Sequence, residues 1–347
     1  MGDHKGPRAA LSRGRGRFLG VSIVMALVST SIIGSVAAAP MCWGERATIV
    51  GTDGPDRLRG TSGPDVIVGL GGADFITGGR GGDLVCGNLG RDKLWGGRGQ
   101  DKIAGGSEQD VLDGNDGDDR LSGGTGSDSL FGSAGDDVFR GGRGRDGAFL
   151  YGPGPLKANL ETGRATGQGR DQLVGIENLS ADASRRKATL IGNDGANTLL
   201  GDAGAGSVLE GRGGNDLLII GEVSGDDVVK GGGGNDSISF GCGSGTTNGN
   251  DTFTGGSGVD VVTYCSEAGE GIVADLDTDT ATATEGNDQG TDSLAGIENL
   301  VGGEGDDTLR GDSADNDLDG DIGDDTIDGR DGQDTCRNGE NVSNCEA

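Results

Sequence analysis

Residues 51–86 read GTDGPDRLR, GTSGPDVIV, GLGGADFIT and GGRGGDLVC, four nonapeptides that follow one another without a gap. The same register continues to Phe149 and gives eleven nonapeptides in all. Position one is Gly and position six is Asp in every one, and position four is Gly except at Glu108. Position eight is large and apolar in ten, with Ala148 in the last. A short fixed period of this kind predicts a stack of similar structural units.

Each position of the nonapeptide has a physical reason. Glycines at positions one, two and four permit the positive φ angles of a tight turn. Positions seven to nine are expected to form a short strand in which only position eight faces inward, because side chains alternate along a strand. One such strand cannot bury its side chain alone, so neighbouring turns must stack. The sequence therefore predicts an all-β fold, a parallel β-roll or β-solenoid.

The aspartates at position six carry the candidate chemistry. Stacking brings them together along the edges of the roll, where their charges repel unless a divalent cation lies between them. Calcium accepts six to eight oxygens in flexible geometry, backbone carbonyls included, whereas magnesium requires a stricter octahedron. We therefore expect multiple calcium ions as cofactor, held in this block by Asp56, Asp65, Asp74, Asp83, Asp92, Asp101, Asp110, Asp119, Asp128, Asp137 and Asp146.

Composition points the same way. The 347 residues include 77 glycines, only 3% are aromatic, and the formal net charge is −29. Such a chain buries too little apolar surface to fold unaided. The acidic balance argues against nucleic acid, whose phosphates require Lys and Arg, and suits cations as partners.

The pattern Gly-Gly-x-Gly-x-Asp-x-apolar-x resembles the RTX, or haemolysin-type, calcium-binding repeat. The resemblance implies that successive nonapeptides alternate between two edges of the roll and that calcium lies between turns eighteen residues apart. One edge would then begin at Asp56 and the other at Asp65, with up to nine sites in the first block. Glu108 departs from the motif and puts the turn of Asp110 in doubt.

A second, less regular block follows the first. Asp236, Asp260, Asp307, Asp325 and Asp334 fit the motif, and Asp216, Asp227 and Asp251 occupy equivalent places. Asn197 and Asn316 replace the aspartate. An amide oxygen brings no charge, so we expect these two sites to be weak or empty.

Two segments that resemble each other interrupt the repeats. Asp171-Gln-Leu-Val-Gly-Ile-Glu-Asn-Leu179 matches Asp292-Ser-Leu-Ala-Gly-Ile-Glu-Asn-Leu300, and alternating apolar residues predict strands that extend or cap the roll. A ligand-binding insertion is the alternative. The expected organisation is a signal peptide (1–39), a cap with the eleven-repeat roll (40–149), a spacer (150–189), an irregular second block (190–263), a second spacer (264–301), and C-terminal repeats with a disulfide loop (302–347).

The N-terminus indicates export. Five basic residues precede an apolar run from Phe18 to Val36, which ends in Ala-Ala-Ala-Pro40, as in a secretory signal. An uncleaved membrane anchor is the alternative, and both interpretations place the remaining chain outside the cytoplasm. Cleavage after residue 39 leaves 23 basic against 56 acidic residues, a net charge of −33, and removes His4, the only histidine.

Six cysteines remain after cleavage, an even number that indicates disulfides in an oxidising compartment. Six cysteines allow fifteen pairings. Proximity in the sequence favours Cys42–Cys86, Cys242–Cys265 and Cys336–Cys345. The last pair resembles a terminal loop of actinobacterial secreted calcium-binding proteins. Zinc is disfavoured, because the mature chain lacks both His and close Cys-x-x-Cys pairs.

The sequence does not indicate an enzyme. Without histidine the usual Ser–His and Cys–His nucleophile pairs cannot form, and the repeats leave no room for a separate catalytic domain. We expect a secreted calcium-binding protein with a structural or surface-interaction role and no membrane span after signal removal. The alternatives are an adhesin or matrix protein that binds a cell-surface partner through its spacers, and an extracellular hydrolase.

Overall fold

The computed structural model describes residues 39–152, 154–182, 187–202, 206–221, 225–240, 249–264, 271–283 and 290–346. The predicted signal peptide therefore lies outside the described residues, apart from Ala39. Residues 39–347 form one compact unit. Its described part is built from strands and turns, without helices, and it contains no helix that could cross a membrane.

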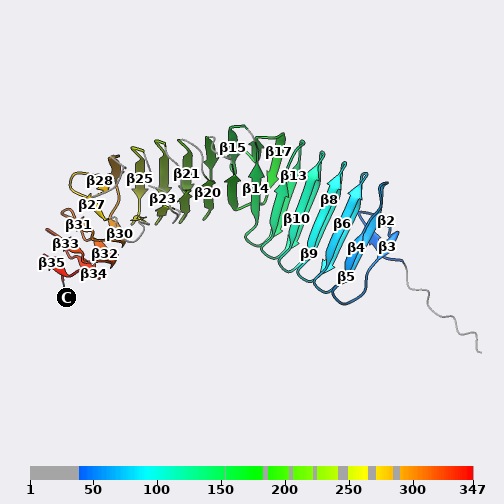
Figure 1. Cartoon of the computed structure of the whole chain (residues 1–347), viewed down its shortest axis with the longest axis horizontal. Helices are drawn as coiled ribbons and strands as arrows, with labels where there is room; N and C mark the ends of the chain where they lie inside the picture. The colour runs from blue at the N-terminus through cyan, green and yellow to red at the C-terminus, as the bar shows by residue number, and fades with distance from the viewer. Residues whose placement is uncertain are drawn as a thin grey trace, which may run out of the picture. The chain divides into compact units, whose positions relative to one another are not determined.

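Two sheets face each other along the roll, and in the repeat blocks the chain alternates between them (Figure 1). The first sheet has 14 strands in one parallel array. In spatial order they are β4 (Arg57–Arg59), β6 (Phe75–Arg80), β8 (Lys93–Arg98), β10 (Val111–Asp116), β12 (Ser129–Gly132), β14 (Gly147–Tyr151), β18 (Asn178–Asp182), β20 (Thr198–Asp202), β22 (Leu217–Ile220), β24 (Ser237–Phe240), β26 (Val261–Thr263), β30 (Asn299–Glu304), β32 (Asp317–Ile322) and β34 (Thr335–Arg337).

The second sheet is also mainly parallel, but each spacer inserts antiparallel strands into it. Its pairings run through β3 (Ile49–Val50), β5 (Val66–Gly71), β7 (Leu84–Leu89), β9 (Lys102–Ser107), β11 (Arg120–Thr125), β13 (Val138–Arg143), β17 (Arg170–Val174), β16 (Arg164–Thr166), β15 (Leu156–Asn159), β19 (Ala188–Ile191), β21 (Val208–Gly213), β23 (Val228–Gly233), β25 (Thr252–Ser257), β29 (Asp292–Ala295), β28 (Thr280–Ala283), β27 (Ile272–Asp275), β31 (Thr308–Arg310), β33 (Thr326–Asp328) and β35 (Asn341–Ser343). A hairpin of β1 (Met41–Cys42) and β2 (Glu45–Arg46) precedes the roll.

The register confirms the eighteen-residue coil. Phe75 pairs with Lys93, and Lys93 pairs with Val111, so two nonapeptides make one turn of the roll. Many strands are six residues long instead of the expected three, because pairing continues past position nine into the turn, as Gly79 does with Gly97. Because parallel strands that stay in register bring successive turns side by side, backbone hydrogen bonds between neighbouring coils continue from the strands into the turns.

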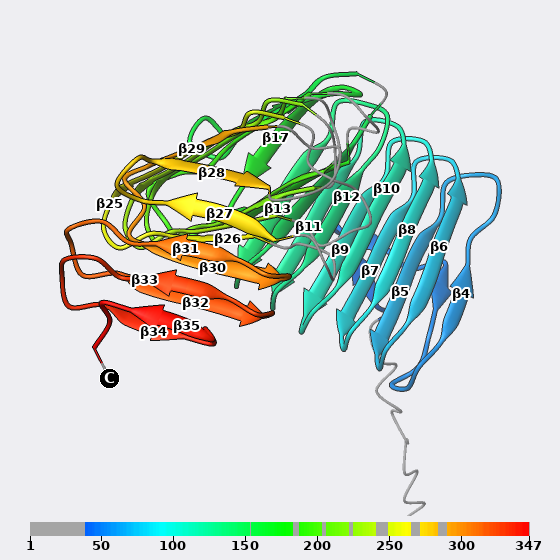
Figure 2. The same cartoon turned by 60° about the vertical axis from the view of Figure 1, so that its left-hand side comes forward.

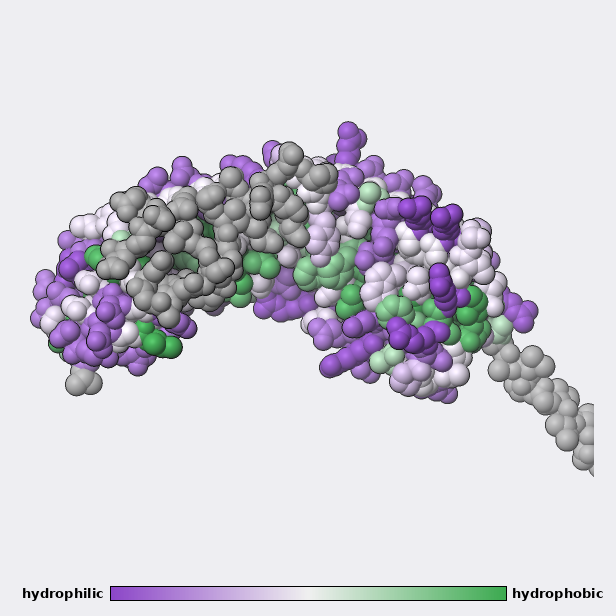
Figure 3. Space-filling model, in the orientation of Figure 1, coloured by the Kyte–Doolittle hydropathy of each residue, from purple (hydrophilic) through white to green (hydrophobic). Residues whose placement is uncertain are grey.

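The core is a column of position-eight side chains. In the first block, residues 67–148, they are at most 1% exposed, and Phe139 and Phe253 are the largest fully buried side chains. One apolar cluster runs from Ile67 to Ile327 through both repeat blocks and both spacers. In Figure 3 hydrophilic residues line the rims of the roll, and hydrophobic residues are visible between them. The two blocks therefore share one continuous core.

Each spacer adds two strands to the second sheet only. Strands β15, β16 and β17 form an antiparallel meander, in which β17 pairs with β13 and β15 pairs with β19. Strands β27, β28 and β29 repeat this arrangement between β25 and β31 (Figure 2). The predicted strands are therefore present, and they extend the roll from within instead of capping its ends.

Candidate metal centre

The aspartates of position six form two rows, one at the start of the strands of each sheet. We call these rows the first seam and the second seam, according to the sheet. Along the first seam the backbone N–H of Asp92 donates to Oδ1 of Asp110 at 2.8 Å, and along the second the N–H of Asp101 donates to Oδ1 of Asp119 at 2.8 Å. The bonded residues are eighteen apart in sequence, so each carboxylate binds the backbone of the preceding coil.

The second carboxylate oxygen, Oδ2, is unusual because in most of these aspartates it is buried without a hydrogen-bond partner in the part of the chain that the structure describes. In fifteen of the nineteen predicted site residues Oδ2 is buried and has no hydrogen-bond partner among the described residues. A buried carboxylate oxygen without a partner costs several kcal/mol unless a proton or a cation compensates it. The fifteen residues are Asp74, Asp83, Asp92, Asp101, Asp110, Asp119, Asp128, Asp137, Asp146, Asp216, Asp236, Asp260, Asp307, Asp325 and Asp334.

The electrostatics of the rows reflect this burial. Loss of hydration, with a smaller contribution from neighbouring carboxylates, raises the pKa of Asp110, Asp119 and Asp137 to about 7. It raises the pKa of Asp307 to about 7 in the C-terminal repeats. Without a cation, these side chains would therefore take up protons near neutral pH.

The glycine at position one makes room for these oxygens. A Cβ atom on Gly78 would lie 2.6 Å from Oδ2 of Asp83 and 2.6 Å from the carbonyl oxygen of Gly96. The φ angle of Gly78 is not in the left-handed region, whereas Gly79 and Gly81 have φ angles of 118° and 124°. The prediction of positive φ is therefore wrong for position one, where close approach of oxygens excludes a side chain. It holds at positions two and four in most repeats, but not in those that begin at Gly51 and Gly60.

The donor set fits a hard cation. Within the described ranges, no three His, Cys, Asp or Glu side chains converge, so a closed zinc-type cluster is absent there. Each turn instead offers one carboxylate beside rows of backbone carbonyls, such as those of Gly79 and Gly81, against which the glycines of the next coil pack. Calcium accepts this mixture of carboxylate, carbonyl and water oxygens.

The turn of Asp110, which the sequence put in doubt, keeps the common geometry. Glu108 adopts the left-handed conformation at position four, with φ of 75°. Asp110 is fully buried, and its Oδ1 accepts the N–H of Asp92 as in the other coils. The substitution therefore costs backbone strain at Glu108 without displacing the carboxylate.

The four remaining predicted residues differ in their partners. Oδ2 of Asp56 accepts the N–H of Thr52, and Oδ2 of Asp65 accepts the N–H of Thr61, each at 2.6 Å. Asp227 and Asp251 are buried and hold their expected places in the second seam. The N–H of Asp227 donates to Oδ1 of Asp251 at 2.7 Å.

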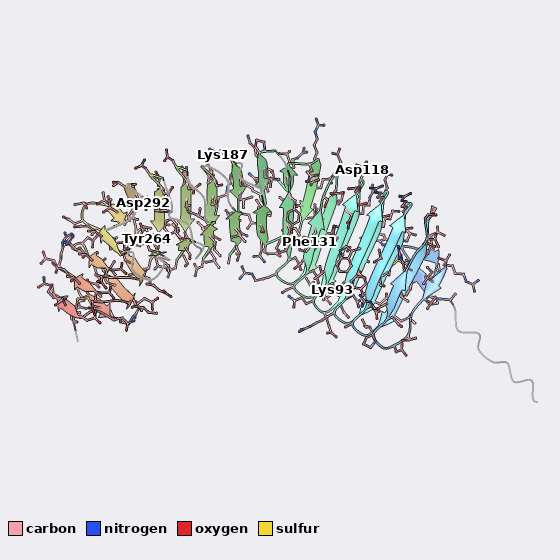
Figure 4. The ribbon with its side chains drawn as sticks, viewed as in Figure 1. Lys93, Asp118, Phe131, Lys187, Tyr264 and Asp292 are labelled. Carbon is pink, nitrogen blue, oxygen red and sulfur yellow. A yellow bond between two sulfur atoms is a disulfide. The ribbon has the colours of Figure 1, made fainter. Side chains whose placement is uncertain are left out.

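Sequence reasoning missed the acids that end these rows. The N–H of Asp137 donates to Oδ1 of Asp171 at 3.0 Å, and the N–H of Asp146 donates to Oε2 of Glu177 at 2.9 Å. In the second spacer, Oδ1 of Asp292 accepts the N–H of Asp251, and Oε2 of Glu298 accepts the N–H of Asp260. The signal was present, because Asp171-Gln-Leu and Glu177-Asn-Leu reproduce the acid-x-apolar spacing of positions six to eight. Asp292 also lies beside Tyr264, whose hydroxyl is 3.5 Å from its Oδ2 (Figure 4).

Comparison with known families accounts for this geometry. The family described as "RTX calcium-binding nonapeptide repeat (4 copies)" matches residues 50–85, 87–112, 113–148, 224–246, 246–263, 292–327 and 301–336, just over half of the chain. The chain belongs to this family. No curated protein matches the chain. Its RTX repeats identify it as a calcium-binding β-roll protein.

Two of the three expected disulfides of this RTX protein are confirmed. Cys42 is bonded to Cys86 across a Cα–Cα distance of 5.8 Å, which fixes the β1–β2 hairpin to the fourth repeat. Cys336 is bonded to Cys345 at the C-terminal end. The third predicted pair, Cys242–Cys265, lies outside the described residues.

Proposed function

We propose that this RTX protein is exported and folds outside the cell by binding calcium along both seams, and that it serves a structural or surface-interaction role. The observation that carries the proposal is the set of fifteen buried Asp Oδ2 atoms without a hydrogen-bond partner among the described residues. Disulfides and RTX repeats are consistent with the oxidising, calcium-rich space outside a cell.

The residues that would hold the ions are the predicted aspartates together with turn carbonyls. Each ion would lie between successive coils and take a carboxylate from one or both of them. It would supply the positive charge that these buried oxygens lack. Because the carboxylates cannot be packed together while ionised and unpaired, binding energy becomes folding energy.

Extracellular calcium modules bind with dissociation constants of about 10⁻⁴ to 10⁻³ M, which millimolar calcium would saturate. The mature chain would therefore remain expanded in the cytoplasm and fold after export. This order of events gives a physical reason for a net charge of −33 after cleavage.

Circular dichroism during calcium titration of the mature chain tests the proposal. We expect β content to rise cooperatively with calcium and to respond weakly to magnesium at the same concentration. Unchanged β content from chelator to excess calcium would refute coupled folding.

A further inference from the structure

Not all turns of the roll have the same hydrogen bonding. In most repeats positions two and four include left-handed residues and the carboxylate Oδ2 is unpartnered. Among the repeats that the structure describes in full, four have no left-handed residue, those beginning at Gly51, Gly60, Gly192 and Gly311. In these four turns the N–H of position two donates to the side-chain oxygen of position six at 2.6 to 2.8 Å. We call them closed turns.

A second hydrogen bond completes each closed turn. The position-two side chain accepts the N–H of position four: Oδ1 of Asn193 from Gly195 at 2.8 Å, and Oδ1 of Asp312 from Ala314 at 2.7 Å. Thr52 and Thr61 do the same through their hydroxyl oxygens at 3.2 Å. Local side-chain bonds of this kind stabilise a turn without a ligand. The position-six oxygen that would face an ion elsewhere is already bonded here.

The closed turns at Asn197 and Asn316 also interrupt the first seam. Nδ2 of Asn197 donates to the backbone carbonyl of Glu177 at 3.0 Å, and Nδ2 of Asn316 donates to that of Glu298 at 2.9 Å. Both asparagines are at least 97% buried. An amide N–H therefore occupies the space between coils, where it repels a cation and satisfies the carbonyl that a cation would need.

A glutamate ends the row immediately before each break. Glu177 accepts the N–H of Asp146, and Glu298 accepts the N–H of Asp260 at 2.8 Å. The aspartates that these glutamates follow, Asp146 and Asp260, are fully buried with an unpartnered Oδ2. Near the C-terminus, Oε2 of Glu346 accepts the N–H of Asp334.

The second seam changes at the same levels. Its rows end at Asp171, Asp292 and Glu340, which accept the N–H groups of Asp137, Asp251 and Asp325. The next rows begin beside Ser207 and Ile272, whose backbone N–H groups donate to Asp227 and Asp307. Neither residue brings a carboxylate, and the hydroxyl oxygen of Ser207 accepts the N–H of Ala188 at 3.4 Å. Both seams therefore stop and restart together at each spacer.

We propose that the calcium seams are divided into three segments that fill independently, separated by the metal-free breaks at Asn197 and Asn316. This inference rests on the proposed calcium binding. On the first seam the segments run from Asp74 to Glu177, from Asp216 to Glu298, and from Asp334 to Glu346. The terminal glutamates hold the last ion of each segment, and the closed turns at Asp56 and Asp65 form a start that requires no calcium.

Hydrogen exchange of the full mature chain, measured segment by segment during calcium titration, tests the division. Asp236→Asn removes a carboxylate from the middle of the second segment, and exposed Asp226→Asn is the matched control. Asp236→Asn should raise the calcium midpoint for protection of β21 and β23 about tenfold. The midpoint for β8 and β10 should change less than about twofold. An equal shift in both segments would overturn the proposal.

This readout also separates the inference from the proposed function. If no segment gains protection with calcium, calcium binding itself has failed, whereas a shared midpoint shift rejects only the division. A variant whose second segment does not fold still reports through the first.

The count of bound calcium after equilibrium dialysis gives an independent test. Asn197→Asp should add one ion per chain, and Glu177→Gln should remove one. Glu45→Gln, an exposed change outside the seams, should leave the count unchanged. Wild-type counts in both seam variants would contradict the assigned breaks and ends.

Discussion

Asp119→Asn should shift stability in opposite directions with and without calcium. Oδ1 of Asp119 accepts the N–H of Asp101 at 2.8 Å, and an asparagine retains this acceptor. The substitution removes the unpartnered Oδ2 and its charge from a side chain that is 1% exposed. The change therefore isolates the charge that calcium is proposed to compensate.

The magnitude follows from the burial of this carboxyl. Burial raises the pKa of Asp119 from 3.8 to about 7. At pH 8 the ionised side chain therefore destabilises the calcium-free fold by on the order of 4 kcal/mol, which asparagine relieves. In calcium, asparagine weakens the adjoining sites, and a loss of about 1.4 kcal/mol corresponds to a tenfold higher calcium midpoint.

The β content in chelator, measured by circular dichroism, reports the first effect. Melts in saturating calcium and a calcium titration at 25 °C report the second. Asp118→Asn is the matched control, because its carboxylate is exposed one residue away (Figure 4). The reasoning is refuted if Asp119→Asn leaves the calcium midpoint within about twofold of wild type or shifts it no more than the control does.

Other perturbations test the turns, the carboxyl rows and the disulfides. Gly78→Ala should lower the stability of the calcium-loaded fold by about 1 to 3 kcal/mol, because its Cβ meets two oxygens. Gly63→Ala, where nothing lies within 4 Å and φ is not left-handed, should be nearly neutral, and equal melting temperatures for the two would contradict this. Glu108→Gly should raise stability by about 1 kcal/mol by relieving the left-handed φ of 75°, and an unchanged or lower melting temperature would count against it. Burial raises the pKa values of Asp110 and Asp137 to about 7. The free energy by which protonation of these two carboxyl groups stabilises the calcium-free fold is therefore fully present below about pH 4 and is lost as pH rises through 7. The chelated protein should thus be more compact at about pH 5 than at pH 8, which scattering at both pH values checks. Its calcium midpoint should be higher at the lower pH, which calcium titration at both pH values checks. Reduction of Cys42–Cys86 should destabilise the calcium-loaded fold by about 4 kcal/mol, and reduction of Cys336–Cys345, which closes a shorter loop, by about 3 kcal/mol. The Cys→Ser variant of the first pair should therefore melt at a lower temperature than that of the second.

The sequence predicted the parts of the fold that its period encodes. Inward position eight follows from a strand period of two, and Ile67 to Ala148 occupy the expected core. The two edges and the eighteen-residue coil were implied by the resemblance to the RTX repeat, and the strand register confirms the coil. The spacers were harder, because apolar alternation does not say whether a strand pairs parallel or antiparallel. Strands β15 to β17 therefore appear as an insertion into one sheet only.

The sequence predicted which aspartates lie in the rows, Asp92 among them, and their binding of calcium stays a prediction. What the sequence could not show is which carboxylates are already bonded. Asp56 and Asp74 look alike in the motif, yet only Asp56 accepts the N–H of a position-two threonine. Glu177 and Glu298 keep the acid-x-apolar spacing but fall outside the nine-residue register, so the spacing alone does not say which coil each one joins.

The two rows of buried carboxylates are proposed to tolerate one another only with calcium between them. Small-angle scattering of the metal-stripped mature chain, at about pH 8 and physiological ionic strength, tests this most directly. The expected result is an expanded chain that contracts cooperatively when calcium is restored. A compact chain in chelator, with a cooperative thermal transition, would contradict the claim.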